Sequence, residues 1–236
     1  MDIASIEANI KRCDNEIAEL IKSIDSMIAS VKGGSSATNA SVASVSGAVY
    51  NGKQFVKLNY SGSTYNVVDS PNMSVVDFVK YIKQYGLYQT AHIGYNDFEN
   101  RCLGVAKAYA RSLMTIGKKI PKNIDDFYGG AYTYFDKGDN ASPNKEYVLR
   151  VVYQELIKGR PCVIQVSTKK GNRHFATVVG MKETVTNASE LKEEDLLIID
   201  AWDGNLEAMD DSETADRHMH AENGKYRVDV FLPSKL

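Results

Sequence analysis

A cysteine, a histidine and an aspartate of this chain stand where predicted helices and strands begin or end. Cys102 begins a long apolar segment, His174 precedes a short apolar run, and Asp200 closes another. Short apolar runs bounded by polar turns are typical of buried strands. In two neighbouring strands, the carboxylate would orient and charge the imidazole, which would in turn ionise a thiol nucleophile. The three residues therefore predict nucleophilic catalysis by a Cys-His-Asp triad.

Only three thiols compete for the role of nucleophile. Cys13 falls in an apolar heptad and Cys162 follows Pro161 in an apolar run, so both are expected to be buried and inert. Cys102 lies at the predicted first turn of a helix, where partial positive charge and unpaired N–H groups stabilise a thiolate. The same N–H groups can contribute to an oxyanion hole. Position alone leaves open a purely structural cysteine at a helix start.

His174 and Asp200 are better candidates for a functional pair together than either residue is alone. Alone, His174 would be read as a satisfied residue at a strand edge. A carboxylate buried at the end of an apolar run, as Asp200 is, must be paired or hydrogen-bonded to stay charged, and a histidine across the strands is a natural partner. His218 and His220 have a spacing that could bind a metal, but they stand in an acidic polar segment. We therefore expect no metal site and no cofactor.

These residues require a sheet with a helix packed against it, and the hydrophobic patterns supply both. Helices are expected over 74–85, from 102 onward and over 147–158, and strands over 162–167, 175–181, 196–199 and 226–233. Residues 121–144 are expected to form a long loop with one short helix, and residues 205–224 a polar loop. A helix-rich first half and a strand-rich second half predict an α+β fold with a mainly antiparallel sheet.

The N-terminal segment has a different character. Residues 2–31 repeat apolar residues every 3.5 positions over about four heptads, which predicts a coiled-coil helix over 1–32. The a positions are Ile3, Ile10, Ile17, Ile24 and Val31, and the d positions are Ile6, Cys13, Leu20 and Met27. Residues 33–45 are rich in Gly, Ser, Ala and Thr, a composition typical of a flexible linker. The catalytic domain is then expected over 46–236.

Taken in order, these motifs resemble the papain-like cysteine peptidases. The chain has a cysteine opening a buried helix, then GRPCVIQVS, RHFATVVG and LLIIDAWDG. The most similar branch is that of the bacteriocin-leader (double-glycine) processing peptidases. The resemblance implies a papain-like fold of a helical half and an antiparallel sheet. It also implies that Cys102 is the nucleophile, His174 the general base and then acid, and Asp200 the orienting carboxylate.

The oxyanion residue departs from the family pattern. The family places an amide side chain, usually Gln, about six residues before the cysteine, and the corresponding residue here is Asn96, one methylene shorter. Asn100 is a second candidate for the same role. The resemblance therefore implies Asn96 in the oxyanion hole but leaves Asn100 open.

The expected function is a cysteine hydrolase, a peptidase that acts on a peptide or protein through a thioester acyl-enzyme. Cell-wall peptides or other amides are alternative substrates, and a toxin-like effector with the same triad is another reading. A catalytically inactive binding module, assembled by the coiled coil, is the alternative from a different class, and the shortened oxyanion residue favours it.

Composition narrows the partners and the compartment. A net charge of −2 gives no electrostatic reason for binding nucleic acid, and no apolar run is long enough for a membrane span. The N-terminus lacks the apolar core of a secretory signal peptide. We expect a cytoplasmic protein or one exported by a non-classical route, and the sequence leaves that choice open.

The heptads predict self-association. The full chain should form a dimer or a higher homo-oligomer through residues 2–31, because apolar a and d positions are buried only against another helix. A truncated chain that begins at residue 46 should be monomeric. Light scattering on both proteins measures this, and a monomeric full-length chain would mean that the helix packs within its own chain or frays.

Overall fold

In the computed structural model of the chain, the structure describes residues 49–50, 53–95, 101–115, 118–136, 140–167, 173–209 and 217–232. The predicted coiled coil over 1–32 and linker over 33–45 lie outside these residues. Among the helices that these ranges contain, none is both long enough and apolar enough to cross a membrane.

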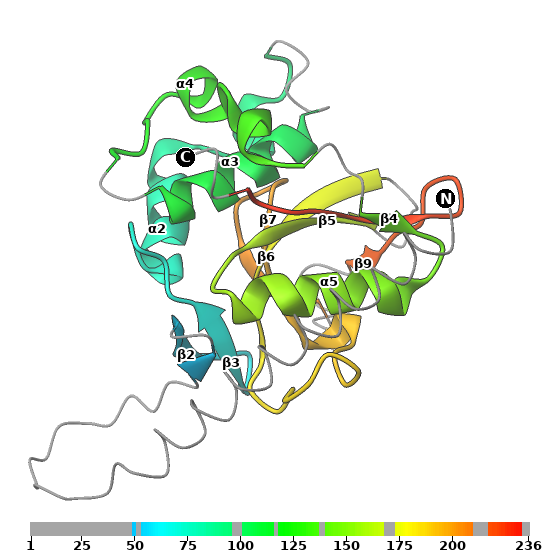
Figure 1. The fold of residues 1–236 in the computed structure, drawn as a ribbon. Helices are drawn as coiled ribbons and strands as arrows, with labels where there is room; N and C mark the ends of the chain where they lie inside the picture. The colour runs from blue at the N-terminus through cyan, green and yellow to red at the C-terminus, as the bar shows by residue number, and fades with distance from the viewer. Residues whose placement is uncertain are drawn as a thin grey trace, which may run out of the picture. The chain divides into compact units, whose positions relative to one another are not determined.

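The described part of the chain has an α+β fold with an antiparallel sheet, as the sequence predicts (Figure 1). The central strand is β6 (Arg173–Lys182), which is buried from its second to its ninth residue. One edge of β6 pairs with β5 (Cys162–Ser167) and then with β3 (Ser63–Val68), and the other edge pairs with β7 (Leu196–Asp200). The remaining strands are β1 (Val49–Tyr50), β2 (Lys53–Tyr60), β4 (Ala141–Ser142), β8 (Leu206–Ala208), β9 (His218–Met219) and β10 (Tyr226–Asp229).

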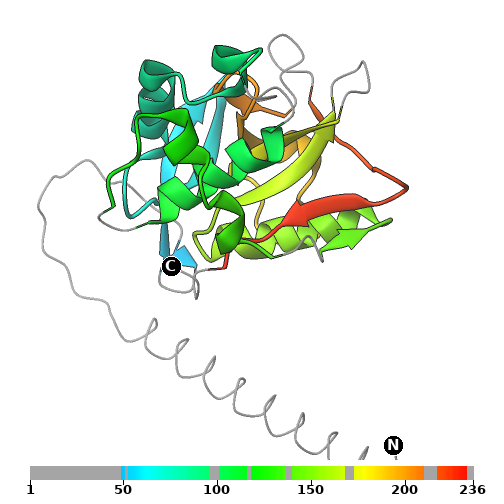
Figure 2. The ribbon, with the colours of Figure 1, turned by 90° about the horizontal axis from the view of Figure 1, so that it is seen from above.

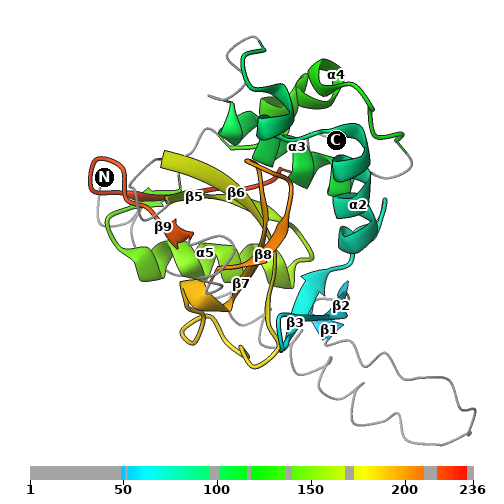
Figure 3. The ribbon, with the colours of Figure 1, turned by 180° about the vertical axis from the view of Figure 1, so that it is seen from behind.

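The strand order follows from which runs are most apolar. The runs of β5, β6 and β7 are buried almost without interruption, so they occupy the centre of the sheet. β10 and β4 continue the sheet beyond β5, and β2 and β1 continue it beyond β3. β8 pairs with β7, and the two strands run side by side when the molecule is seen from behind (Figure 3).

Local signals predict the first helix well. In α2 (Val75–Tyr85), the Ser74 side chain accepts a hydrogen bond from the N–H of Asp77 at 3.1 Å, which makes it the N-cap. Gly86 follows the helix with φ of 62°, the left-handed conformation in which glycine commonly ends helices. Short 3-10 helices, η1 (Gln89–His92) and η4 (Glu193–Asp195), connect other elements.

Two longer helices pack against opposite faces of β5 and β6 (Figures 1 and 2). In α3 (Cys102–Met114), nine consecutive or nearly consecutive residues are buried, and the Ala106 carbonyl accepts a 2.8 Å hydrogen bond from the Thr177 hydroxyl of β6. α5 (Lys145–Ile157) also contacts β10, along which it lies in Figure 2. The sheet is therefore covered on both faces where the three central strands meet.

A buried cluster of charges fixes α3 to the sheet. The Lys107 ammonium lies 2.6 Å from the Asp229 carboxylate of β10, and Arg227 donates to the same carboxylate at 2.7 Å. The ammonium also lies 5.0 Å from the Tyr132 ring centre and 5.1 Å from that of Phe135. A charge buried among aromatic rings needs a partner, so this ion pair links α3 to β10 in addition to its packing on β5 and β6.

The structure corrects the sequence expectation in two polar segments. The expected loop over 205–224 contains β8 and β9. Residues 121–144 contain the expected short helix, α4 (Ile124–Tyr128), together with η3 (Ala131–Tyr134) and β4, which the sequence did not predict. β8 and β9 have two or three residues each, too few to show a periodic pattern. They form because β8 pairs with the buried strand β7 and β9 with the buried strand β5, and the local sequence does not reveal this pairing.

The buried ion pair makes a stability prediction. Asp229→Ala should lower the free energy of unfolding by about 3–5 kcal/mol, because it leaves the Lys107 ammonium buried without a carboxylate. Urea denaturation followed by circular dichroism measures the loss. Lys80→Met is the control, since it breaks the exposed pair with Asp77 and should leave the midpoint nearly unchanged. Equal effects of the two substitutions would contradict the role given to Asp229.

Candidate active site

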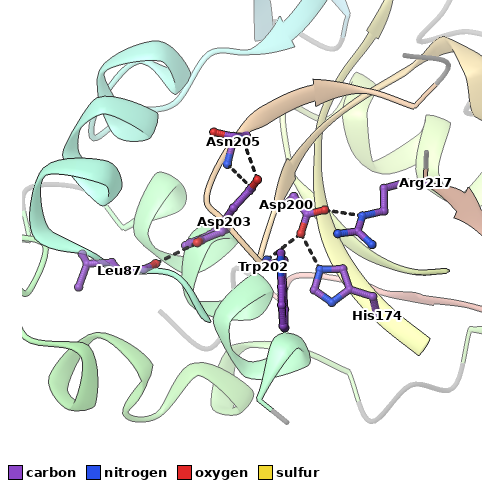
Figure 4. Close-up of polar contacts among 8 residues, drawn as sticks. Leu87, His174, Asp200, Trp202, Asp203, Asn205 and Arg217 are labelled. Atoms are coloured by element: carbon purple, nitrogen blue, oxygen red, sulfur yellow. Dashed lines mark hydrogen bonds and ion pairs between the residues drawn. The ribbon is translucent and has the colours of Figure 1, made fainter. Parts of the chain in front are cut away.

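The sheet brings His174 and Asp200 together, as the sequence predicts. In the antiparallel register of β6 and β7, Asp200 pairs with Ala176, and His174 lies two residues further along β6 on the same face. The His174 Nε2 atom lies 2.6 Å from the Asp200 Oδ1 atom, and both side chains are buried (Figure 4). Because β7 ends at Asp200, the imidazole projects beyond the end of that strand.

A tight turn after β7 holds the carboxylate. The Asp200 carbonyl accepts from the Gly204 N–H at 2.9 Å, and the Asp200 N–H donates to the Asn205 carbonyl at 2.9 Å. Gly204 has φ of +73°, which side-chain-bearing residues rarely adopt. The turn directs the Trp202 N–H at Asp200 Oδ1, which it reaches at 2.7 Å. Asp200 Oδ1 is therefore shared between a backbone amide and the imidazole.

The second carboxylate oxygen has its own partner, which the sequence did not suggest. The Arg217 Nε atom donates to Asp200 Oδ2 at 2.6 Å, and both side chains are largely buried (Figure 4). Glu207 of β8 is also buried nearby, and the charge of Asp200 affects its ionisation. Both residues lie in the segment that the sequence predicts as a polar loop. The one available signal was that a buried carboxylate needs more than one partner.

Electrostatics favour a charged imidazole. Burial alone would lower the pKa of His174, but hydrogen bonds with Asp200 and Cys102, and their charges, raise it to about 9. Burial alone would raise the pKa of Asp200, but the His174 hydrogen bond and the charges of His174 and Arg217 lower it. At neutral pH the site therefore holds an imidazolium bonded to a carboxylate.

Cys102 lies near enough to the imidazole to contribute to the raised pKa of His174. Because Asp200 occupies Nε2, Nδ1 is the ring nitrogen left for another partner. Cys102 is the first residue of α3 and is half-buried. Arg101 occupies the N-cap position, and its guanidinium lies 5.3 Å from the ring centre of Tyr128. The thiol thus sits at the positive end of a buried helix.

Aromatic side chains surround the thiol and the imidazole. The Trp202 ring meets the His174 ring edge-on with centres 6.5 Å apart, and it remains 40 % exposed. Tyr128 packs over the first turn of α3, so closely that a Cβ at position 104 would come within 1.9 Å of its ring. Gly104 is therefore required by the packing beside Cys102. Tyr132, whose hydroxyl lies 3.4 Å from that of Tyr128, is half-exposed.

The remaining residues that the sequence analysis considered are another cysteine, two asparagines and a histidine. The Cys162 thiol is fully buried, and burial raises its pKa well above the usual value, as expected for an inert cysteine. The two candidates for the oxyanion hole, Asn96 and Asn100, lie outside the described residues. The His92 Nε2 atom donates a 2.7 Å hydrogen bond to the Gly86 carbonyl.

The arrangement suits acid–base and nucleophilic chemistry by side chains. Within the ranges that the structure describes, no group of three or more His, Cys, Asp or Glu side chains could hold a metal ion. Comparison of the chain with protein-family models, curated proteins and solved structures finds no match. The chemistry must therefore be argued from the geometry of the site.

The His174–Asp200 hydrogen bond predicts a measurable change in protonation. Asp200→Ala removes the hydrogen bond and charge that raise the pKa of His174, so burial should bring that pKa down from about 9. Titration of the imidazole by NMR measures this, with His174→Gln used to assign the resonance. A pKa that stays near 9 in Asp200→Ala would show that Asp200 does not control the imidazole.

Proposed function

We propose that this chain is a papain-like cysteine hydrolase that cleaves peptide amides through a Cys102–His174–Asp200 triad. The observation that carries the proposal is the buried 2.6 Å hydrogen bond between His174 and Asp200, near enough to Cys102 at the start of a buried helix that the cysteine contributes to the raised pKa of the imidazole. No metal or organic cofactor enters this mechanism.

The reaction begins from an ion pair of thiolate and imidazolium. The Cys102 sulfur attacks the carbonyl carbon of the substrate, and the carbonyl oxygen gains the negative charge. N–H groups at the start of α3, with Asn96 or Asn100, hold that oxygen. His174 then gives its Nδ1 proton to the departing amine, and a thioester to Cys102 remains.

Hydrolysis reverses the proton transfer. His174, now neutral, takes a proton from a water molecule that attacks the thioester carbon. The acid product leaves as the Cys102–carbon bond breaks, and the thiolate and imidazolium are restored. Asp200 keeps its charge throughout and holds the ring in the tautomer that directs Nδ1 at the sulfur.

The raised pKa of His174 supports this division of roles. With a pKa of about 9, the imidazole carries a proton at neutral pH and can serve as the acid for the leaving amine. The half-exposed Trp202 ring covers one side of the imidazole and limits the water that reaches it. The papain-like resemblance and the N-terminal coiled coil complete the proposal, with a coiled-coil helix that assembles copies of a catalytic domain.

The thiol tests the proposal without knowledge of the substrate. Brief iodoacetamide treatment of the native protein at about pH 6 should alkylate Cys102 selectively, because only a thiolate reacts rapidly at that pH. Cys162 serves as an internal control, since burial opposes its ionisation. His174→Ala should largely remove the selectivity, because the thiolate loses its imidazolium partner. Peptide mapping by mass spectrometry measures the labelling at each cysteine.

The opposite result favours the binding module. Equal and slow labelling of the cysteines, unchanged by His174→Ala, would falsify the hydrolase and leave a catalytically inactive domain as the better account. Selective labelling with no cleavage of peptides would leave the triad in place and move the substrate to another amide, such as those of cell-wall peptides.

A further inference from the structure

Arg217 reaches Asp200 from a third element of the sheet. Its Nε atom lies 2.6 Å from Asp200 Oδ2, while Oδ1 accepts from His174 and from the Trp202 N–H. The two oxygens of the carboxylate therefore have different partners, and the donors fix the plane of the group. The terminal torsion of an aspartate is broad and two-fold, so a carboxylate without such donors rotates easily.

The short strand β9 holds Arg217 in place. Met219 of β9 pairs with Val166 of β5, and Val166 pairs with His174 of β6, so the three residues form one row across the sheet. The Met219 N–H also donates to a Glu193 carboxylate oxygen at 3.0 Å. Arg217 directly precedes this anchored strand, on the same end of the sheet as the imidazole.

The charges around Asp200 explain why a cation is needed there. Asp203 and Glu207 lie close enough that the charges of Asp200 and Asp203 affect the ionisation of Glu207. Burial and these charges raise the pKa of Glu207 to about 8, so this carboxyl group keeps its proton at neutral pH. Burial opposes ionisation of Asp200, but the hydrogen bond and charge of His174, followed by the charge of Arg217, lower its pKa in the same surroundings.

We propose that Arg217 is a positioning residue that fixes the Asp200 carboxylate so that Oδ1 stays directed at His174. The inference rests on the proposed function, because it concerns how the triad is oriented. Arginine suits the role since its planar guanidinium presents directed N–H donors, whereas lysine is a flexible point charge. Residues 205–224 contain no member of the proposed triad, but through Arg217 they help to orient the Asp200 carboxylate.

The test compares Arg217→Met and Arg217→Lys with Arg160→Met. Arg160 is a matched control, because its Nε atom also donates to a buried carboxylate at 2.6 Å, that of Glu155, away from the triad. The first readout is the pKa of His174 by NMR titration, which needs neither substrate nor turnover. The second is the rate of Cys102 alkylation at about pH 6, corrected for the folded fraction.

A positioning role and a simple charge effect predict opposite changes. If Arg217 only supplied positive charge, its removal would raise the pKa of His174. If it orients Asp200, the carboxylate turns away in Arg217→Met, and the pKa of His174 should fall by about one unit. Alkylation of Cys102 should slow by up to about tenfold, since one pKa unit of the imidazole changes the ratio of ion pair to neutral pair by a factor of ten. Arg217→Lys should fall between wild type and Arg217→Met, and Arg160→Met should lose stability alone.

The remaining outcomes distinguish failure of the positioning role of Arg217 from failure of the proposed hydrolase. An unchanged or raised pKa of His174 in Arg217→Met would exclude positioning by Arg217, whatever the alkylation rate. If Arg217→Met does not fold, a wild-type pKa and alkylation rate in Arg217→Lys would exclude it equally. Absence of selective Cys102 labelling in the wild-type protein would instead count against the hydrolase, while the titrations would still test how Arg217 acts on Asp200.

Discussion

The hydrogen bond between His174 and Asp200 is buried where three central strands end, and the site depends on keeping it paired. A buried carboxylate costs free energy unless every oxygen finds a donor. Here those donors come from β6, from the backbone turn after β7 and from Arg217 beside β9. The same requirement that keeps Asp200 charged thus brings separate parts of the sheet to one point. The need to pair the Asp200 charge therefore also fixes the position of the His174 imidazole.

The other half of the site is set by how α3 docks. Its apolar surface would pack on a sheet in more than one orientation, but the buried Lys107 must meet Asp229. Gly104 then lets Tyr128 lie directly over the first helical turn, beside Cys102. Since Lys107 and Cys102 share one rigid helix, the ion pair at one point of α3 helps determine where the thiol lies. The ion pair that anchors α3 therefore also bears on the position of Cys102.

Features carried by long runs or strong local signals could be predicted from the sequence. The α+β class, the helix that begins after Ser74, the buried strands around His174 and Asp200, and the inert Cys162 all follow from periodicity, capping and burial. Arg217 and Glu207 could not be predicted in the same way. Glu207 belongs to β8 and Arg217 directly precedes β9, and these strands of two or three residues form by pairing with distant strands, so no local pattern marks either residue. The sequence does not show which buried strand each short segment pairs with in the folded protein.

The pairing of β6 has a consequence for how the protein is made. β6 joins β3, which precedes it by more than half of the domain, with β7, which follows it, and β10 supplies the carboxylate on which α3 docks. Sheets whose strands pair across long sequence separations fold slowly, because a long loop must close before the two strands can meet. On a ribosome, Cys102 emerges long before His174, Asp200 and Arg217, and the Lys107 ammonium of α3 has no carboxylate partner until β10 appears. A nascent chain would therefore carry Cys102 without the groups that surround it in the finished fold.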